Sequence, residues 1–268
     1  MPTHRLNGAR LFYEVTGTGP WVVFAHGGEG TRLHWWAQVA ALQHRFRCVT
    51  YDARGFGQSE IGDAPASDNL HRDDLLALMD HLGIERAHLV GQSMGGLAVS
   101  GVAIQTPERV DRLVMSDTPF NFATSALAEW STLMIEKITN GFAVLDYLFA
   151  PAFDQRRPDL SYLYRALSRL NPVRDGPQGL DAYEAWRDQP IVDYRDFPVA
   201  SLFIVGSEDE LTLPWLMRAT AAAVGGSTLV EIEGAGHSPY AEQTPYYNEV
   251  LEEFLSQSSA RRAPQLLP

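Results

Sequence analysis

The stretch from His88 to Ala98 reads HLVGQSMGGLA, and it decides the fold. The apolar run Ala87–Val90 predicts a strand, the turn GQSMG follows it, and helical periodicity then predicts a helix over Met94–Gln105. A serine hydroxyl is a poor nucleophile at neutral pH unless it is exposed and a neighbouring base takes its proton. A sharp strand-turn-helix connection with the spacing G-x-S-x-G exposes Ser93, which makes it the candidate nucleophile. The alternative is that Ser93 only caps the helix.

Short apolar runs alternate with helical patterns along most of the chain, which is typical of βα units and a mostly parallel sheet. Runs such as WVVFA and SLFIV are apolar throughout, as expected of strands that are covered on both faces. The predicted strands are Arg10–Thr16, Trp21–Ala25, Phe46–Tyr51, Ala87–Val90, Arg112–Ser116, Ala200–Val205 and Thr228–Ile232. The predicted helices are Asp68–Leu82, Met94–Gln105, Pro214–Val224 and Pro245–Ser256. The predicted fold class is therefore α/β, with helices flanking a parallel sheet.

The stretch 118–197 interrupts this alternation. It has no convincing strand, and it holds 13 of the 28 aromatic residues of the chain. Its helical patterns are Ser125–Asn140, Val144–Leu148, Leu160–Leu170 and Leu180–Arg187. We therefore expect residues 118–197 to form a helical cap over a site at the strand ends, on a core made of 1–117 and 198–257. The tail 258–268 contains two prolines and no periodicity, and we expect it to be loose.

The segment FAHGGEG, which ends the strand Trp21–Ala25 and continues to Gly30, supplies a second candidate feature. Acyl transfer develops an oxyanion that needs two rigidly held donors about 3 Å away. We assign these donors to the backbone N–H groups of Met94, directly after the nucleophile, and of Gly28, in the glycine-rich turn. His26 is expected to have a structural role.

Six residues are candidate substrate contacts, and each has a less specific alternative. They are Glu29, Trp35, Trp36, Phe120, Trp130 and Trp186. Glu29 could instead face solvent, and the two tryptophans that follow it could anchor the next helix against the sheet. The three aromatic residues of the stretch 118–197 could form the core of the cap itself.

His237 is the candidate base, because EIEGAGHSPYAEQ places it in a glycine-flanked loop after the last predicted strand. Such a loop can bring an imidazole to the strand ends, and its unperturbed pKa of ~6.5 suits proton transfer. No group of histidines has the spacing H-E-x-x-H or another convincing metal pattern, so we expect no metal site.

Five segments, in the same order, resemble those of the α/β-hydrolase fold proteins: AHGG, YDARGFGQS, GQSMGG, GSEDELT and GAGHSPYAEQ. The resemblance covers the chain from about Leu6 to Leu255, and it implies an eight-stranded sheet, a cap after strand six and a Ser–His–acid triad without a cofactor. The family's acid lies about three residues beyond the glycine that ends its strand, which is Asp209 here. Its neighbours Glu208 and Glu210 are then expected to face solvent. The alternative acid is Asp117, in VMSDTP, because some relatives place theirs after the preceding strand.

The resemblance implies a serine hydrolase that cleaves a carboxylic ester, thioester or lactone of a small to medium apolar substrate. Lactonases, aryl esterases and cofactor-free perhydrolases resemble this chain. Haloalkane dehalogenases and epoxide hydrolases also resemble it, but they carry aspartate in place of Ser93, so the serine disfavours these two activities. Meta-cleavage-product C–C hydrolases usually have Asn before the serine and Trp after the histidine, where this chain has Gln92 and Ser238. C–C hydrolysis of a diketone is therefore the alternative reaction. A receptor-like binding module with vestigial turnover is the alternative from a different class.

Composition limits the partners. The 268 residues carry a formal net charge of −12, which disfavours binding to nucleic acid or to anionic membranes. A small-molecule substrate is the expected partner, and we expect a monomer or a homodimer. The N-terminus has no signal-peptide pattern, and no run approaches the ~20 apolar residues of a membrane span. The single cysteine, Cys48, lies in an apolar run, so we expect it to be a buried thiol. These features favour a cytoplasmic location.

Overall fold

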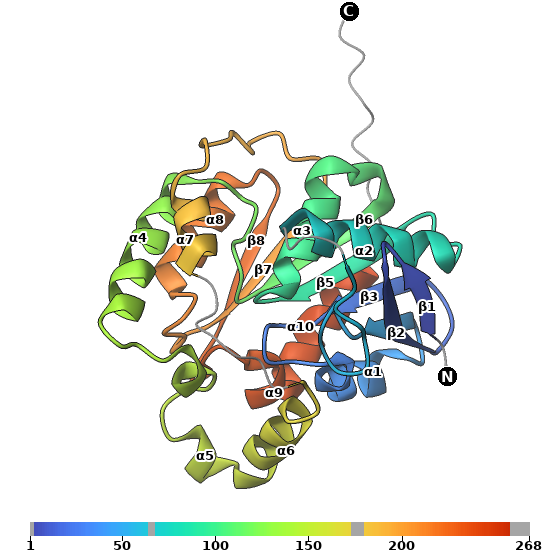
Figure 1. The fold of residues 1–268 in the computed structure, drawn as a ribbon, viewed down its shortest axis with the longest axis horizontal. Helices are drawn as coiled ribbons and strands as arrows, with labels where there is room; N and C mark the ends of the chain where they lie inside the picture. The colour runs from blue at the N-terminus through green and yellow to red at the C-terminus, as the bar shows by residue number, and fades with distance from the viewer. Residues whose placement is uncertain (1–2, 64–67, 173–179, 258–268) are drawn as a thin grey trace, which may run out of the picture.

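The structure, a computed structural model, describes residues 3–63, 68–172 and 180–257, which form an eight-stranded sheet with helices on both faces (Figure 1). The strands are β1 (Thr3–Leu6), β2 (Ala9–Thr16), β3 (Trp21–Ala25), β4 (Arg47–Tyr51), β5 (Ala87–Gln92), β6 (Val110–Ser116), β7 (Ser201–Gly206) and β8 (Thr228–Ile232). Their order across the sheet is β1-β2-β4-β3-β5-β6-β7-β8. The pairs β1/β2 and β2/β4 are antiparallel and the others are parallel. The predicted α/β class and the mostly parallel sheet are confirmed.

Strand β1 is the one strand in these ranges that the apolar pattern did not predict. Three of its four residues are exposed, so no apolar run marks it. It is joined to β2 by Asn7 and Gly8, whose φ angles of 45° and 81° are those of a two-residue hairpin turn. The Asn-Gly pair was therefore the local signal for this hairpin.

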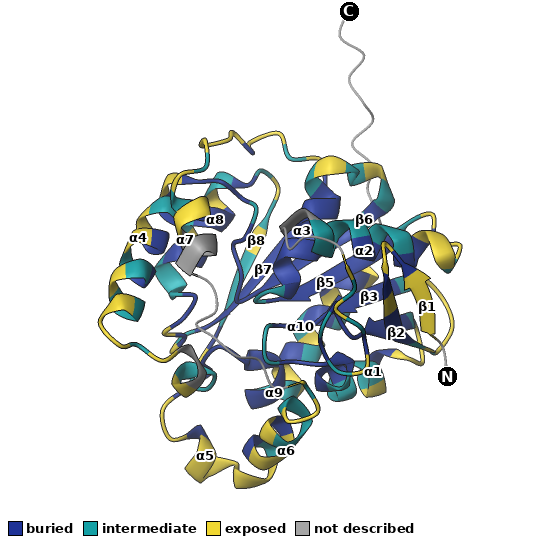
Figure 2. Ribbon diagram, viewed as in Figure 1, coloured by how far each residue is buried: buried dark blue, intermediate teal, exposed yellow. Residues whose placement is uncertain are grey.

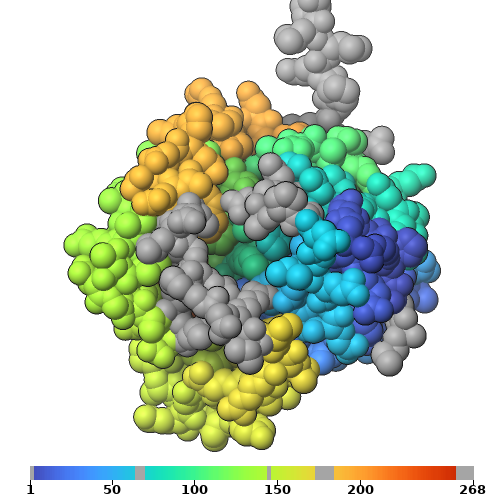
Figure 3. Space-filling view, in the orientation of Figure 1, coloured from blue at the N-terminus to red at the C-terminus, as the bar shows by residue number. Residues whose placement is uncertain are grey.

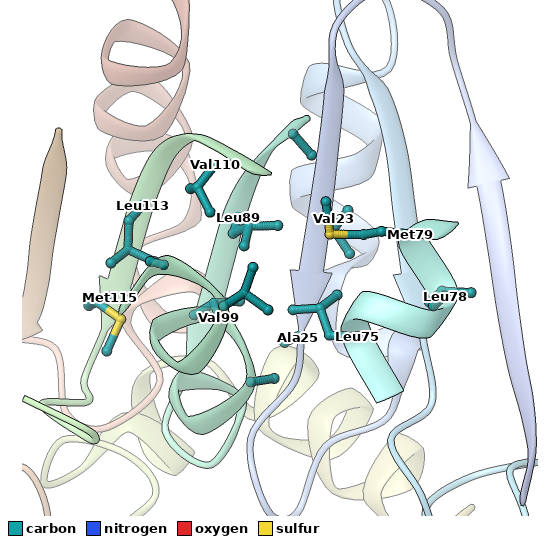
Figure 4. Close-up of a cluster of buried hydrophobic side chains, with 14 of the residues drawn as sticks. Val23, Ala25, Leu75, Leu78, Met79, Leu89, Val99, Val110, Leu113 and Met115 are labelled. Atoms are coloured by element: carbon teal, nitrogen blue, oxygen red, sulfur yellow. The ribbon is translucent and has the colours of Figure 1, made fainter. Parts of the chain in front are cut away.

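Alternating side chains of the strands build two hydrophobic layers. Val23 and Ala25 of β3 face α2 (Asp68–His81) and α3 (Gly95–Gln105), as Figure 4 shows, and α8 (Pro214–Ala223) joins this layer. Val22 and Phe24 face the opposite layer, which includes α1 (Trp36–Leu42) and α10 (Thr244–Ser256). The central strands are consequently buried on both sides (Figure 2). None of the helices in the described ranges combines the length and the apolar character needed to cross a lipid bilayer.

Between β6 and β7 the described residues form a series of helical segments, as the sequence predicts. They are α4 (Ser125–Thr139), η3 (Val144–Tyr147), α5 (Phe153–Arg156), α6 (Pro158–Ser168) and α7 (Leu180–Arg187). The remaining short helices of these ranges are η1 (Arg32–Trp35), η2 (Pro107–Arg109) and α9 (Pro239–Glu242). Helix α4 packs against α7 and α8, whereas α6 packs against η1 and α9, so the insertion has two parts that rest on different loops of the core (Figure 1). The tail 258–268 lies outside the described residues.

Candidate active site

Five candidate residues follow five parallel strands at one edge of the sheet. Gly28 follows β3, Ser93 follows β5, Asp117 follows β6, Asp209 follows β7 and His237 follows β8. Because these strands are parallel neighbours, their carboxyl ends share an edge, which is where open α/β sheets bind ligands. The surface drawn in Figure 3 is hollowed near its centre, and the green and teal part of the chain, which includes β5, α3 and β6, is seen at depth there.

Ser93 occupies the turn between β5 and α3 in a strained backbone conformation. Its φ is 47°, in the left-handed region that residues with a Cβ rarely adopt. Its N–H donates a hydrogen bond to the carbonyl oxygen of Ser116 at 3.1 Å, which fixes the turn against β6. Helix α3 has no side-chain cap, so capping does not explain this serine. The turn holds a partly exposed hydroxyl at the sheet edge despite the strain.

Two glycines allow α3 to begin close to the sheet. A Cβ on Gly95 would lie 2.1 Å from the carbonyl oxygen of Ala25, and a Cβ on Gly91 would lie 2.5 Å from Cγ2 of Val99. Both separations are shorter than real atoms tolerate, so the close approach requires glycine at these positions. The G-x-S-x-G spacing is thus explained by packing on either side of Ser93.

His237 and Asp209 are joined by a buried hydrogen bond. The Nδ1–H of His237 donates to Oδ2 of Asp209 at 2.9 Å, and the two side chains are 6% and 0% exposed. Oδ1 of Asp209 accepts two further bonds, from the N–H groups of Leu211 at 2.8 Å and Thr212 at 2.9 Å. The two flanking glutamates are exposed, as expected. Because the carboxylate holds the proton on Nδ1, Nε2 of His237 is left as the acceptor nitrogen.

Asp117 is a second buried carboxyl beside this pair. Asp117, Asp209 and His237 each offer an atom within 4.8 Å of the other two, a spacing that a cation could bridge. The Asp117 oxygens already accept hydrogen bonds, Oδ1 from the N–H of Gly206 at 3.0 Å and Oδ2 from the hydroxyl of Ser116 at 2.8 Å. Burial, and then the charge of Asp209, raise the pKa of Asp117 well above its usual range. The imidazole bonds to Asp209, while Asp117 lies beside this pair, bonded to Gly206 and Ser116.

Two residues that the sequence did not single out fix the loop that carries His237. Nε2 of Gln92 donates to the carbonyl oxygen of His237 at 2.9 Å. Oε1 of the buried Glu242 accepts from the N–H groups on either side, those of Gly236 at 2.9 Å and Ser238 at 3.2 Å. An acid in the first turn of a helix that begins with proline was a local signal for such contacts. Gln92 had none, because its partner is 145 residues away.

The loop from His26 to Gly30 lies beside the turn of Ser93. Nε2 of His26 accepts the N–H of Ala53 at 2.9 Å, so its Nδ1–H donates to the carbonyl oxygen of Gly27 at 2.7 Å, and the ring is structural. A Cβ on Gly27 would lie 3.2 Å from the Cβ of Ser93, which places the loop against the candidate nucleophile. In the described part of the chain, neither the N–H of Gly28 nor that of Met94 donates a hydrogen bond to the protein.

The six candidate substrate contacts occupy three environments. Glu29 is half-buried in the loop beside Ser93. Trp35 is fully buried between Phe24 and Tyr240, at ring separations of 5.1 and 4.9 Å, and the partly buried Trp36 packs against the same hydrophobic layer.

Phe120, Trp130 and Trp186 form a buried cluster between α4, α7 and α8. Phe120 stacks on Trp186 with ring centroids 4.1 Å apart, and Nε1 of Trp130 donates to the carbonyl oxygen of Leu211 at 2.8 Å. Met94, next to Ser93, packs against this cluster. The three aromatics therefore have a packing role, on the side of the insertion that borders the candidate nucleophile.

Two curated relatives are named as an enol-lactonase and as a putative carbamate hydrolase. The 3-oxoadipate enol-lactonase 1 of Acinetobacter baylyi is 30% identical over an alignment of 224 residues, which covers 79% of this chain and 80% of that protein. The putative carbamate hydrolase RutD of a Caulobacter species is 42% identical over 112 residues, but this match spans only 39% of this chain and 41% of that protein.

Solved structures with the same fold include more than one kind of hydrolase. A thermophilic esterase from Thermogutta terrifontis is 26% identical with a TM-score of 0.77, covering 95% of this chain and 98% of that one. The meta-cleavage product hydrolase of Pseudomonas fluorescens is 26% identical with a TM-score of 0.72, covering 95% of this chain and 97% of that one. The model of the alpha/beta hydrolase fold family matches residues 20–244. This chain is a hydrolase, and it belongs to the alpha/beta hydrolase fold family.

Proposed function

We propose that this hydrolase cleaves a carboxylic ester, thioester or lactone of a small to medium apolar acid through an acyl-enzyme on Ser93. The observation that carries the proposal is the buried hydrogen bond between His237 and Asp209, at the sheet edge where Ser93 is held at a φ of 47°. A carboxylate that fixes the imidazole with Nε2 as acceptor is the arrangement that activates a serine hydroxyl.

In the acylation step the Oγ of Ser93 attacks the acyl carbon and its proton passes to Nε2 of His237. The N–H groups of Gly28 and Met94 donate hydrogen bonds to the carbonyl oxygen as negative charge develops on it. When the tetrahedral intermediate collapses, the C–O or C–S bond to the leaving group breaks, and the leaving alkoxide or thiolate takes the proton from His237. In a lactone the alkoxide stays attached to the acyl chain, so no fragment is released at this stage.

In the deacylation step water replaces the leaving group. His237 removes a proton from the water as it attacks the acyl carbon, and returns that proton to Oγ of Ser93 as the ester bond to the serine breaks. Asp209 keeps its hydrogen bond to the Nδ1–H of His237 and stabilises the imidazolium. In the net reaction, one water is added across the C–O or C–S bond, which gives a carboxylic acid and an alcohol or thiol. No atom changes its oxidation state, so the reaction needs no redox partner.

Residues 118–197 are proposed as a cap over this site, on a core made of 1–117 and 198–257. The hydrophobic cluster of Phe120, Trp130 and Trp186 supports this assignment, since it packs beside Met94. An insertion that borders the nucleophile sets the size and polarity of the acyl pocket, which is why the proposal specifies an apolar acid. A small-molecule substrate is the proposed partner.

A fluorophosphonate probe and an acyl-length panel test this function together. The probe should label Ser93 and no other residue, and Ser93→Ala should abolish both labelling and turnover of activated esters and lactones. Native, folded protein that is neither labelled nor active on any ester, thioester or lactone would refute the proposal. Release of a dienoate from a meta-cleavage-type diketone, with inertness toward aryl esters, would assign C–C hydrolysis instead. Tight ligand binding by Ser93→Ala without wild-type turnover would indicate a receptor-like module.

A further inference from the structure

Asn171, three residues beyond the end of α6, bonds the insertion to the loop that carries Gly28. Its Nδ2 donates to the carbonyl oxygens of Glu29 and Gly30, both at 3.1 Å. Its Oδ1 accepts the N–H of Gly57 at 2.8 Å. The orientation of the amide follows from these partners, since the two carbonyls can only accept and the N–H can only donate. One side chain thus joins its own segment to two others, which lie 114 and 142 residues away in sequence.

The loop that Asn171 holds is a tight turn. The N–H of Gly30 donates to the carbonyl oxygen of Gly27 at 3.0 Å, which leaves Gly28 and Glu29 at the central positions. A Cβ on Gly28 would meet no atom within 4 Å, so packing does not fix the peptide planes there. The Gly28 N–H lies in the same peptide plane as the Gly27 carbonyl, which accepts from Nδ1 of His26 and from the N–H of Gly30. Asn171 holds the peptide that bears this Gly30 N–H through the carbonyl of Glu29, and the following peptide through the carbonyl of Gly30.

The same part of the insertion also contacts the loop of His237. On α6, the hydroxyl of Tyr164 accepts a hydrogen bond from the hydroxyl of Ser238 at 3.3 Å. Ser168, four residues later, is 3.2 Å from Nε2 of His34, in the short helix that follows the glycine-rich turn. Tyr164 and Ser168, four residues apart, share one side of α6, and Asn171 follows in the turn after the helix. That side rests on both loops of the candidate site.

We propose that Asn171 is a positioning residue for the oxyanion hole, which orients the N–H of Gly28 by bonding the carbonyl groups of Glu29 and Gly30. The inference rests on the proposed function of the site and extends it, since it makes the oxyanion hole depend on the helical insertion. Asn171 does not touch the reacting atoms, and its effect passes through the backbone of the turn. Its loss should therefore slow the chemical step more than it weakens substrate binding.

The variant Asn171→Asp separates the two halves of the side chain. The carboxylate keeps the size of asparagine and still accepts the N–H of Gly57, but it cannot donate to the two carbonyls. We expect kcat for an activated ester to fall about 10- to 100-fold, with KM changed much less, because misplacing one donor by ~1 Å is known to cost rates of this order. The second-order rate of fluorophosphonate labelling and the affinity for an alkylboronic acid, whose tetrahedral adduct places an oxygen in the oxyanion hole, should fall by similar factors. Arg169→Ala, an exposed change in the same segment, is the control that should leave all these values unchanged.

Each outcome decides the inference. Wild-type kcat in Asn171→Asp, or a loss confined to KM, overturns it while leaving the proposed function intact. If thermal unfolding shows that the aspartate variant does not fold, Asn171→Ala, which brings no charge near the carbonyls, is measured in the same way with the same expectation. If the wild-type protein itself neither turns over nor labels, the proposed function fails, and the inference is rejected with it.

Discussion

Asp117 and Asp209 are both buried carboxyls, and their hydrogen bonds assign them different roles. Asp209 accepts two backbone N–H bonds on one oxygen and the Nδ1–H of His237 on the other. Asp117 is bonded to Ser116 and Gly206 and does not reach the imidazole in the described structure. Burial, and then the charge of Asp209, raise the pKa of Asp117 and so favour its protonated form.

The matched substitutions Asp209→Asn and Asp117→Asn test this assignment. In Asp209→Asn an amide N–H faces the Nδ1–H of His237, so the imidazole loses its acceptor or changes tautomer, and kcat should fall about 10³- to 10⁴-fold. Asparagine resembles a protonated aspartic acid in shape and in hydrogen bonding, so Asp117→Asn should change kcat less than about tenfold. Both constants are read from steady-state hydrolysis of one activated ester, with thermal unfolding to confirm the fold. The reverse ranking would move the acid to the end of β6.

At the scale of the element, the start of α3 combines a strained residue with close packing. The Cβ of an alanine at position 95 would lie 2.1 Å from the carbonyl oxygen of Ala25, a backbone atom that cannot turn aside. Gly95→Ala should therefore push α3 away from β3, move Ser93, and lower the free energy of unfolding by about 1–3 kcal/mol, the range of overpacking in a core. Gly101→Ala in the same helix is the control, since its Cβ would meet only the Arg72 side chain at 3.0 Å and longer. Denaturant unfolding measures both, and equal stability of the two variants would show that the close approach is not required.

The elements show which features local sequence can predict. The strands Trp21–Ala25 and Thr228–Ile232 and the helix Leu180–Arg187 have the bounds that their patterns predicted. The first is a continuous apolar run, the second is rich in β-branched residues, and the third has a helical period. Strand β1 and the four-residue helices α5 and α9 were missed, since so few residues give no period to detect.

In the candidate site, too, local sequence predicts some residues and misses others. Ser93 and His237 carry local signals, a glycine pattern and a glycine-flanked loop after a strand, and the family resemblance added Asp209. Gln92 and Asn171 act through partners 145 and 142 residues away, and only the folded chain brings these partners together. Side chains that hold loops in place are therefore harder to predict from sequence than the groups proposed to do the chemistry.

At the scale of the whole molecule, buried titratable groups make stability depend on pH in two opposing ways. Burial lowers the pKa of His34 to about 3 and that of His88 to about 4, so the unfolded chain binds protons at these positions that the folded chain does not. Their contribution to stability is present above pH ~6.5 and is lost as the pH falls toward those values. Burial instead raises the pKa of Glu242 to about 7, in spite of the N–H groups that it binds. The contribution of Glu242 to stability is therefore lost as the pH rises, opposite to that of the two histidines. A substitution of Glu242 separates the two effects.

Glu242→Gln isolates the carboxyl contribution. Below pH ~4.5 the side chain is protonated in both states of the chain, but between ~4.5 and ~7 it ionises in the unfolded state first, so the folded state loses stability as the pH rises. The difference in free energy of unfolding between wild type and Glu242→Gln should therefore shift by about 3 kcal/mol against the wild type over this interval, and stay constant above it. Denaturant unfolding at half-unit steps from pH 4.5 to 8 measures the shift. Glu253→Gln, the same change at an exposed position of α10, should run parallel to wild type. Parallel curves for Glu242→Gln as well would mean that this carboxyl ionises in the folded chain as readily as in water.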